Sequence, residues 1–180
     1  MTRERTIGNP LIGDRVTFLV TAAESDRQYE LVEVELNPGG GNGLHYHTSF
    51  EEEFEALEGL LYIDCDGRTH VLKPGEKLVA PRRSVHRFYN PGHEKIRFKV
   101  RIVPARSFEP MLRIAYGLTN DGRTNGKGVP RNLLEMAVIF HLGESYLPNL
   151  PFVVQKGLFA PLHALAVWIG VKKRLLRRYA

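Results

Sequence analysis

The amino-acid sequence predicts a mainly β fold, an antiparallel sandwich or barrel, followed by α-helices. Between residues 16 and 103, short runs of alternating apolar and polar residues are separated by turn-forming residues. From Ser107 onward, the apolar residues change to a helical spacing of about 3.6 residues. A third observation concerns function: histidines and a glutamate, which are common metal ligands, gather in two short stretches of the β part.

The first part of the chain is predicted from its alternation. Residues 1–15 are polar, and we expect them to form an arm over the surface. Strands are expected at 16–20 and 29–36, because apolar side chains occupy every second position in both. The residues expected to face inward are Val16, Phe18, Val20, Val32, Val34 and Leu36.

The remaining strands lie between recognisable turns. Asp66-Gly67 is a two-residue signal for a type I′ hairpin. Cys65, just before it, is expected to be a half-buried strand residue. The strands expected here are 54–65 with a turn near Gly59, then 69–72, 78–80, 83–89 and 96–103.

Four side chains are candidate metal ligands. His45 and His47 are two residues apart, so a strand would point both imidazoles to one face. Glu52 has an odd offset from His47, but a turn between them would let the chain present it to the same interior. His86, near the end of a later strand, supplies a fourth donor. This set suits one divalent transition metal, with Fe, Mn, Zn, Ni and Cu all compatible.

The two histidine-containing stretches resemble the signature of the cupin superfamily over about residues 30–103. Nine of ten signature positions are present in the right order and spacing, and the exception is Arg83, where the family has glycine. We expect from the arginine that this turn does not need the conformational freedom of glycine. The nine matching positions are Gly39, His45, His47, Glu52, Gly59, Gly75, Pro81, His86 and Asn90.

The resemblance implies a double-stranded β-helix, a jelly-roll barrel, with the metal inside. The chain is similar to small single-domain cupins of the cupin-2 type with an added helical extension. We therefore expect a barrel domain over 1–105 and a helical domain over 106–180. Glu51 is the alternative ligand if only three residues separate it from His47. Cupins of this kind are often homodimers, and a homodimer is expected here.

The helical part has three predicted segments. Ser107 is the expected N-cap of the first helix, which Gly117 and the following Asn-Asp-Gly would end. A second helix is expected over 130–142, and a third region over 152–179, with Pro161 as a start or a kink. This region is apolar up to Val171, but it is too interrupted for a membrane span.

Charge and composition restrict the class of partner and compartment. The formal net charge is +5, and the last ten residues contain five basic and no acidic side chains, so the remainder is neutral. We expect no nucleic-acid binding, although the basic tail makes weak contact with a membrane surface an alternative. The N-terminus lacks the features of a signal peptide and a single cysteine cannot form an internal disulfide, so a cytoplasmic location is expected.

Five further residues are candidates for binding a small-molecule substrate. Arg83 would offer a guanidinium to a carboxylate or phosphate at the barrel mouth. The other four are expected around the cavity: Tyr62, Phe54, Phe88 and Asn90. Each of these has an ordinary structural interpretation as well, as an exposed turn residue or a core residue. We see no inward-facing acid or base beyond the ligands, so no catalytic residue is assigned.

Three functions are compatible with these observations. The favoured one is a metal-dependent oxygenase, decarboxylase or isomerase that acts on a small oxygen-rich organic molecule. The first alternative is a module that binds or senses a small ligand without chemistry. The second is a scaffold that docks on a membrane or a partner through its helical tail.

Overall fold

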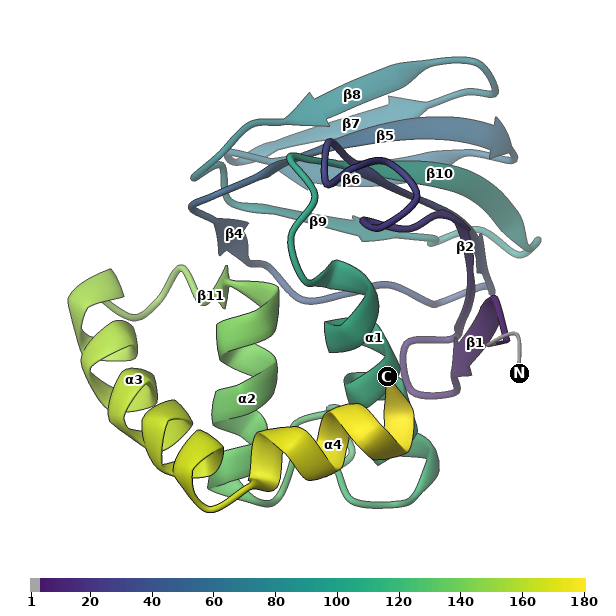
Figure 1. The fold of residues 1–180 in the computed structure, drawn as a ribbon. Coiled ribbons are helices and arrows are strands. Elements are labelled where there is room, and N and C mark those ends of the chain that lie inside the picture. Colours follow the sequence, from purple (N-terminus) through teal and green to yellow (C-terminus); the bar gives the residue numbers. More distant parts are fainter. Residues whose placement is uncertain (1–3) are drawn as a thin grey trace.

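Two packed β-sheets form the upper part of the molecule, and helices lie beneath them (Figure 1). The structure is a computed structural model that describes residues 4–180. The larger sheet has the strand order β1-β2-β3-β10-β5-β8, the smaller one β7-β6-β9, and β4 pairs separately with β11. The strands are β1 (Thr6–Asn9), β2 (Asp14–Val20), β3 (Glu30–Leu36), β4 (Tyr46–His47), β5 (Glu51–Glu58), β6 (Leu61–Cys65), β7 (Arg68–Leu72), β8 (Lys77–Ala80), β9 (His86–Tyr89), β10 (Ile96–Val103) and β11 (Ser145–Tyr146).

The core between the sheets follows the predicted alternation. β3 and β10 pair along their whole length, and every second residue of each is buried. In β2, Val16 and Phe18 are buried as predicted, whereas Val20 is only half-buried because a bulge interrupts the pairing with β3 after Phe18. β10 lies between β3 and β5, strands that are distant in sequence, and this crossover confirms the predicted jelly-roll sandwich.

The N-terminal segment differs from its prediction. The expected arm over residues 1–15 is wrong for the described residues, because Thr6–Asn9 form β1 and pair with β2. β2 itself begins at Asp14, two residues earlier than expected. Residues 1–3, also assigned to the arm, lie outside the described residues. By contrast, Asp66 and Gly67 both have positive φ, as the predicted hairpin turn requires.

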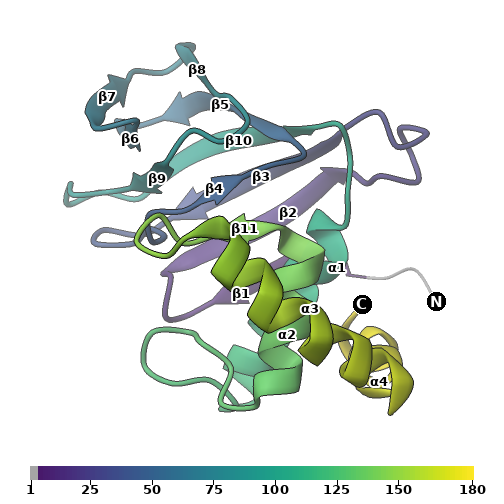
Figure 2. The same ribbon diagram turned by 90° about the vertical axis from the view of Figure 1, so that its left-hand side faces the viewer.

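Four helices follow β10, with β11 between the second and the third: α1 (Phe108–Asn120), α2 (Leu133–Gly143), α3 (Phe152–Trp168) and α4 (Val171–Tyr179). Figure 2 shows them on one side of the β layer, with α3 nearest the viewer. The third predicted region is two helices rather than one, and their axes differ by 78°. Pro161 lies inside α3, and the chain turns at Gly170, whose φ is +78°. The expected boundary at residue 105 falls between β10 and α1.

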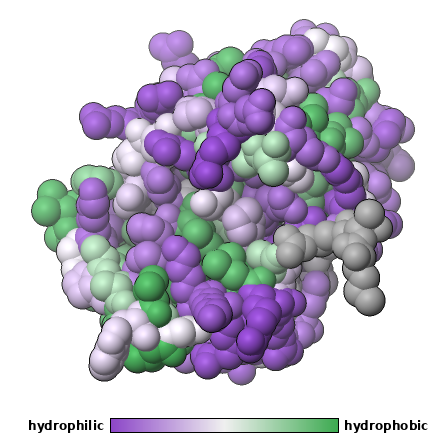
Figure 3. All heavy atoms as spheres, in the orientation of Figure 1, coloured by the Kyte–Doolittle hydropathy of each residue, from purple (hydrophilic) through white to green (hydrophobic). Residues whose placement is uncertain are grey.

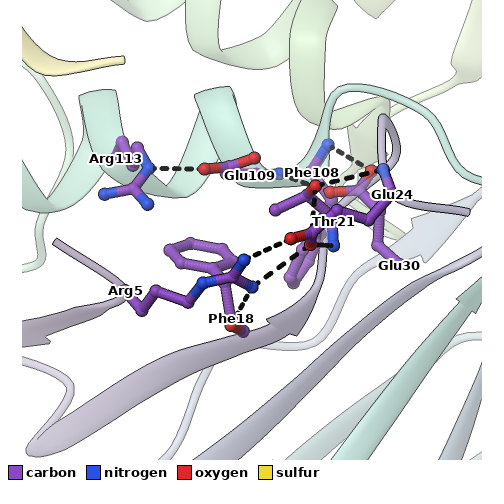
Figure 4. A network of polar contacts seen from close by, with 8 residues as sticks. All are labelled: Arg5, Phe18, Thr21, Glu24, Glu30, Phe108, Glu109 and Arg113. Carbon is purple, nitrogen blue, oxygen red and sulfur yellow. Dashed lines mark hydrogen bonds and ion pairs between the residues drawn. The ribbon is translucent and has the colours of Figure 1, made fainter. Parts of the chain in front are cut away.

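The start of α1 is fixed to the sheet by Glu30 rather than by Ser107. The Ser107 side chain makes no capping hydrogen bond. Instead, the buried Glu30 carboxylate of β3 accepts hydrogen bonds from the backbone N–H groups of Phe108 and Glu109 (Figure 4). It also accepts from the backbone N–H of Arg106. Gly117 was expected to end the helix, but it lies inside α1. These contacts hold α1 across the open side of the sandwich.

The outer face of α3 is apolar and exposed. Trp168 is 83% exposed, and Val153 is 77% exposed. Figure 3 shows hydrophobic atoms at the lower left, over α3, next to hydrophilic atoms over α4 at the bottom. Among the described residues, no individual helix has the length and hydropathy of a membrane span; α3 and α4 meet those criteria only when joined across their bend.

Candidate metal centre

Three strands and one loop bring the four predicted ligands together. His47 lies on β4, Glu52 on β5 and His86 at the start of β9. His45 lies in the loop before β4, where its backbone N–H donates to the His86 carbonyl at 3.0 Å and its carbonyl accepts from the His86 N–H at 2.8 Å. This pair of bonds joins the two histidine-containing stretches although they are far apart in sequence.

The donor atoms converge on one point. One ligand atom from each of the four residues lies within 4.8 Å of all the others. Glu52 is central: its Oε2 is 3.0 Å from His86 Nε2, and its Oε1 is 3.8 Å from His47 Nε2. Glu51, the alternative ligand, is not a member of this cluster.

Backbone carbonyls orient all three imidazoles. The Nδ1 atoms of His45, His47 and His86 lie 2.8, 3.3 and 3.0 Å from the carbonyl oxygens of Gly43, Glu144 and Ser84. Because a carbonyl only accepts, each Nδ1 carries a proton. The neutral rings of His45 and His47 therefore direct an Nε2 lone pair inward, whereas His86 Nε2 donates to the Glu52 carboxylate. His47 Nε2 is buried without a hydrogen-bond partner.

The electrostatics of the cluster favour an anionic Glu52 carboxylate that accepts from His86 and faces neutral rings at His45 and His47. Burial alone would raise the pKa of Glu52, but the His86 hydrogen bond and the three imidazoles outweigh it and hold the pKa at about 2. Burial lowers the pKa of His45 to about 4 and also lowers that of His47. At His86, burial opposes protonation, but the neighbouring Glu52 carboxylate raises the pKa.

These residues fit a divalent metal ion. Bonds of about 2.1 Å place neighbouring ligands about 3 Å apart and opposite ones about 4.2 Å apart, so the observed cluster needs only a small contraction. A cation would also satisfy the unpartnered His47 nitrogen and neutralise Glu52. Imidazole and carboxylate donors suit iron, manganese, zinc, nickel or copper.

An apolar cavity of about 320 Å³ opens beside the cluster and is lined by His45, His47 and Glu52. Phe54 and Phe88, two of the predicted substrate-binding residues, also line it. Its floor is formed by the sheet, and α1 closes it with a row of side chains. These α1 residues are Phe108, Met111, Leu112 and Tyr116.

The other three predicted substrate residues lie outside the cavity lining. Tyr62 packs against Tyr89 on the smaller sheet, with ring centroids 5.6 Å apart. Asn90 is buried, and its amide donates to the carbonyls of Leu36 and Glu94, which fixes a turn. Arg83 is exposed, and no described contact directs its side chain to the cluster. A role in substrate binding stays a prediction for these residues.

The expectation about the Arg83 turn is wrong. Arg83 has a φ of +70°, so the turn does adopt the left-handed conformation that glycine favours. The glycines at the other three signature positions, Gly39, Gly59 and Gly75, also have positive φ. At position 83 the backbone N–H donates to the His47 carbonyl at 2.6 Å, and this bond requires the turn.

Two features of the site were missed in the sequence. Asp14 and Tyr116 line the cavity and face each other, although no inward acid had been expected. The signal for Asp14 was its two-residue spacing from the inward Val16. The second feature is the contact of Glu144 with His47, reinforced by the β4–β11 pairing, and no local pattern could have shown it.

Comparisons with known proteins agree with this architecture. The family model described as "Cupin domain" matches residues 32–103. The chain is 36% identical over 69 residues to "Polyketide synthase CurC" of Streptomyces cyaneus, covering 38% of this chain and 45% of that protein. It is 34% identical over 104 residues to "Quercetin 2,3-dioxygenase" of Bacillus subtilis (strain 168), covering 57% of this chain and 30% of that protein.

Solved structures with similar folds include the polyketide cyclase RemF of Streptomyces resistomycificus. It has 25% identity and a TM-score of 0.48, with coverage of 59% of this chain and 72% of that chain. A predicted oxalate decarboxylase of Thermotoga maritima has 20% identity and a TM-score of 0.49, with coverage of 58% and 98%. The chain spans half or less of the length of the curated relatives it matches.

Proposed function

Because residues 32–103 form a cupin domain, we propose that the chain is a metal-dependent enzyme that acts on a small organic molecule with an apolar body and metal-binding oxygen atoms. The observation that carries the proposal is that His45, His47 and Glu52 belong both to the candidate metal cluster and to the wall of an apolar cavity. A molecule in the cavity would therefore reach the metal directly.

The donor set determines what the metal would offer. Four protein ligands leave two positions on a six-coordinate ion, enough for a bidentate group such as an enol-ketone or a catechol. When bound, the metal supplies Lewis-acid polarisation, or electron transfer if it is iron, manganese or copper. Oxygenase, decarboxylase and isomerase chemistry all fit this description, and the name of the Bacillus subtilis relative favours the first.

The chain's own residues have three tasks in this proposal. The backbone carbonyls at Gly43, Glu144 and Ser84 hold the imidazoles through Nδ1, so that each Nε2 would face the metal. The side chains of α1 close the cavity and exclude water from the bound molecule. The apolar walls bind the flat body of the substrate and present its oxygen atoms to the cluster.

Metal content is the first test. Protein purified without chelators or a histidine tag is analysed for metals beside His47→Ala, with the exposed His93→Ala as a matched control. We expect about one equivalent in the wild type and in His93→Ala, and less than about a tenth in His47→Ala. Equal metal content in His47→Ala and the wild type would contradict the four-ligand site.

Turnover separates an enzyme from a binding module. The metal-loaded protein is incubated with 3-hydroxyflavone, whose enol-ketone binds metals, and its absorbance and the dissolved oxygen are followed. Conversion that His47→Ala abolishes supports the enzyme. Tight binding without any change in the flavone supports the alternative, a ligand-binding module that performs no chemistry.

The scaffold alternative has one observation in its favour, the exposed apolar face of α3 beside the basic α4. A homodimer or a weak membrane contact would cover that face. Both remain predictions, as does the cytoplasmic location. In the scaffold alternative, His47→Ala would be tolerated, whereas removal of residues 152–180 would abolish docking on the membrane or partner.

A further inference from the structure

The cavity beside the metal cluster contains a second polar group, the pair Asp14–Tyr116. Asp14, at the start of β2, is only 5% exposed, and Tyr116 of α1 is also buried. The Tyr116 hydroxyl donates to Asp14 Oδ2 at 2.5 Å. The other carboxylate oxygen, Oδ1, is buried and has no hydrogen-bond partner. Both residues line the same cavity as His45 and His47.

The pair and the metal cluster lie at opposite ends of this cavity. Two strands, β3 and β10, separate β2 from β5 in the sheet. At about 4.8 Å between neighbouring strands, Asp14 and Glu52 would be about 14 Å apart across a flat sheet, and curvature shortens this distance. Along the strands they are also offset: Asp14 is level with Ile96 of β10, and Glu52 with Ile102.

The hydrogen bond from Tyr116 joins Asp14 to α1, but it occupies only Oδ2, and no described residue pairs with Oδ1. The next inward residues of β2, Val16 and Phe18, are apolar. Burial and hydrogen bonding act on Asp14, and no cation contributes to its environment. A buried carboxylate oxygen without a partner costs free energy, so its retention indicates a partner that arrives with a ligand.

We propose that Asp14, oriented by Tyr116, accepts a hydrogen bond from a hydroxyl group at the end of the substrate remote from the metal. This deepens the proposed function, on which the position of the metal-binding end rests. The cavity would then select elongated molecules with apolar rings, a metal-binding oxygen pair at one end and a hydroxyl donor at the other. Asp14 contacts the substrate, and Tyr116 is a positioning residue.

A pair of probes tests whether Asp14 recognises a hydroxyl group. 2-Naphthol and 2-methylnaphthalene have similar size and shape, but only the first donates a hydrogen bond. Their dissociation constants are measured by fluorescence with the wild type, Asp14→Asn and Tyr116→Phe. The matched control is Glu135→Gln, which neutralises another buried carboxylate, on α2 and outside the cavity lining. Each protein is measured as purified and after removal of metal with a chelator.

In the wild type we expect 2-naphthol to bind at least about tenfold more tightly than 2-methylnaphthalene, with or without metal. Asp14→Asn should lose or reverse this preference, since a neutral amide is a weaker acceptor and the hydroxyl still has to be desolvated. Tyr116→Phe should reduce the preference partly, and Glu135→Gln should keep it.

Two results would overturn the inference. One is an unchanged preference for 2-naphthol in Asp14→Asn. The other is a wild-type preference for 2-naphthol that is lost when the metal is removed, which would mean that the metal binds the hydroxyl group. Because the comparison works on metal-free protein, failure of the metal-content test leaves this test valid. The two proposals therefore fail separately.

Discussion

At the scale of single residues, Asp14 carries an electrostatic cost of burial that its hydrogen bonds relieve only in part. Burial raises the pKa of Asp14 from 3.8 to about 6, against the opposing hydrogen bond from Tyr116. The folded state therefore binds this proton more tightly than the unfolded state, and stability contributed at Asp14 is lost as pH rises from about 4 to about 6. A shift of this size corresponds to about 3 kcal/mol at most.

Asp14→Asn should therefore stabilise the protein at neutral pH. An amide oxygen still accepts from Tyr116, and no buried charge remains. We expect the free energy of unfolding in urea to rise by about 1–3 kcal/mol at pH 7.5, and the gain to vanish near pH 4, where the wild-type carboxyl is protonated as well. A variant that is less stable than the wild type at pH 7.5 would show that the carboxylate has a structural role.

Arg83 offers a second test at this scale. The left-handed backbone costs a non-glycine residue about 1–2 kcal/mol, and the Arg83 side chain is exposed. Arg83→Gly should raise the free energy of unfolding by about 1 kcal/mol and leave metal content unchanged. The neighbouring exposed Arg82, which does not have positive φ, is the matched control: Arg82→Gly should be neutral or destabilising. Equal effects of the two substitutions would refute the backbone explanation.

At the scale of elements, the helices are anchored through close contacts. α1 meets α4 where a Cβ atom on Gly117 would overlap the Tyr179 ring. That ring cannot move freely, because the Tyr179 hydroxyl donates to Asp121 at 2.5 Å and accepts from Arg123 at 3.3 Å. The glycine is therefore required by packing between helices, and not by the end of a helix.

Gly117→Ala should destabilise the protein by about 1–2 kcal/mol, since the overlap outweighs the better helix propensity of alanine. Gly157→Ala is the control: Gly157 lies inside α3 with open space around its α-carbon, so alanine should stabilise by up to about 1 kcal/mol. Thermal unfolding of both variants measures the difference. Stabilisation by both substitutions would mean that α4 does not pack on α1 as described.

How much of these elements could be predicted depends on whether the signal is local. Alternation gave β3 and β10 correctly, and signature spacing selected the four residues that now cluster. β1 was missed because its residues show little alternation and it exists through pairing with β2. The contact of Glu144 with His47 joins residues 97 positions apart, which only tertiary structure reveals. Asp14 was missed although its spacing from Val16 was visible.

At the scale of the whole molecule, the helical part and the metal cluster form one coupled unit. The Glu144 carbonyl at the end of α2 holds His47, and the Glu144 carboxylate accepts from the Ser49 hydroxyl. β11 pairs with β4 next to these contacts, and α1 closes the cavity. A metal bound to His47 should therefore stabilise a segment of the helical part that is distant in sequence from the ligands.

Hydrogen–deuterium exchange measures this coupling on the full chain. Adding metal to metal-free protein should slow amide exchange about tenfold at residues 145–147, in parallel with β4, because opening β11 would release His47 from its carbonyl. Exchange in α4, which does not line the cavity, should stay unchanged, and His47→Ala should abolish the protection at β11. Protection confined to the barrel strands would show that the helices and the metal cluster act independently.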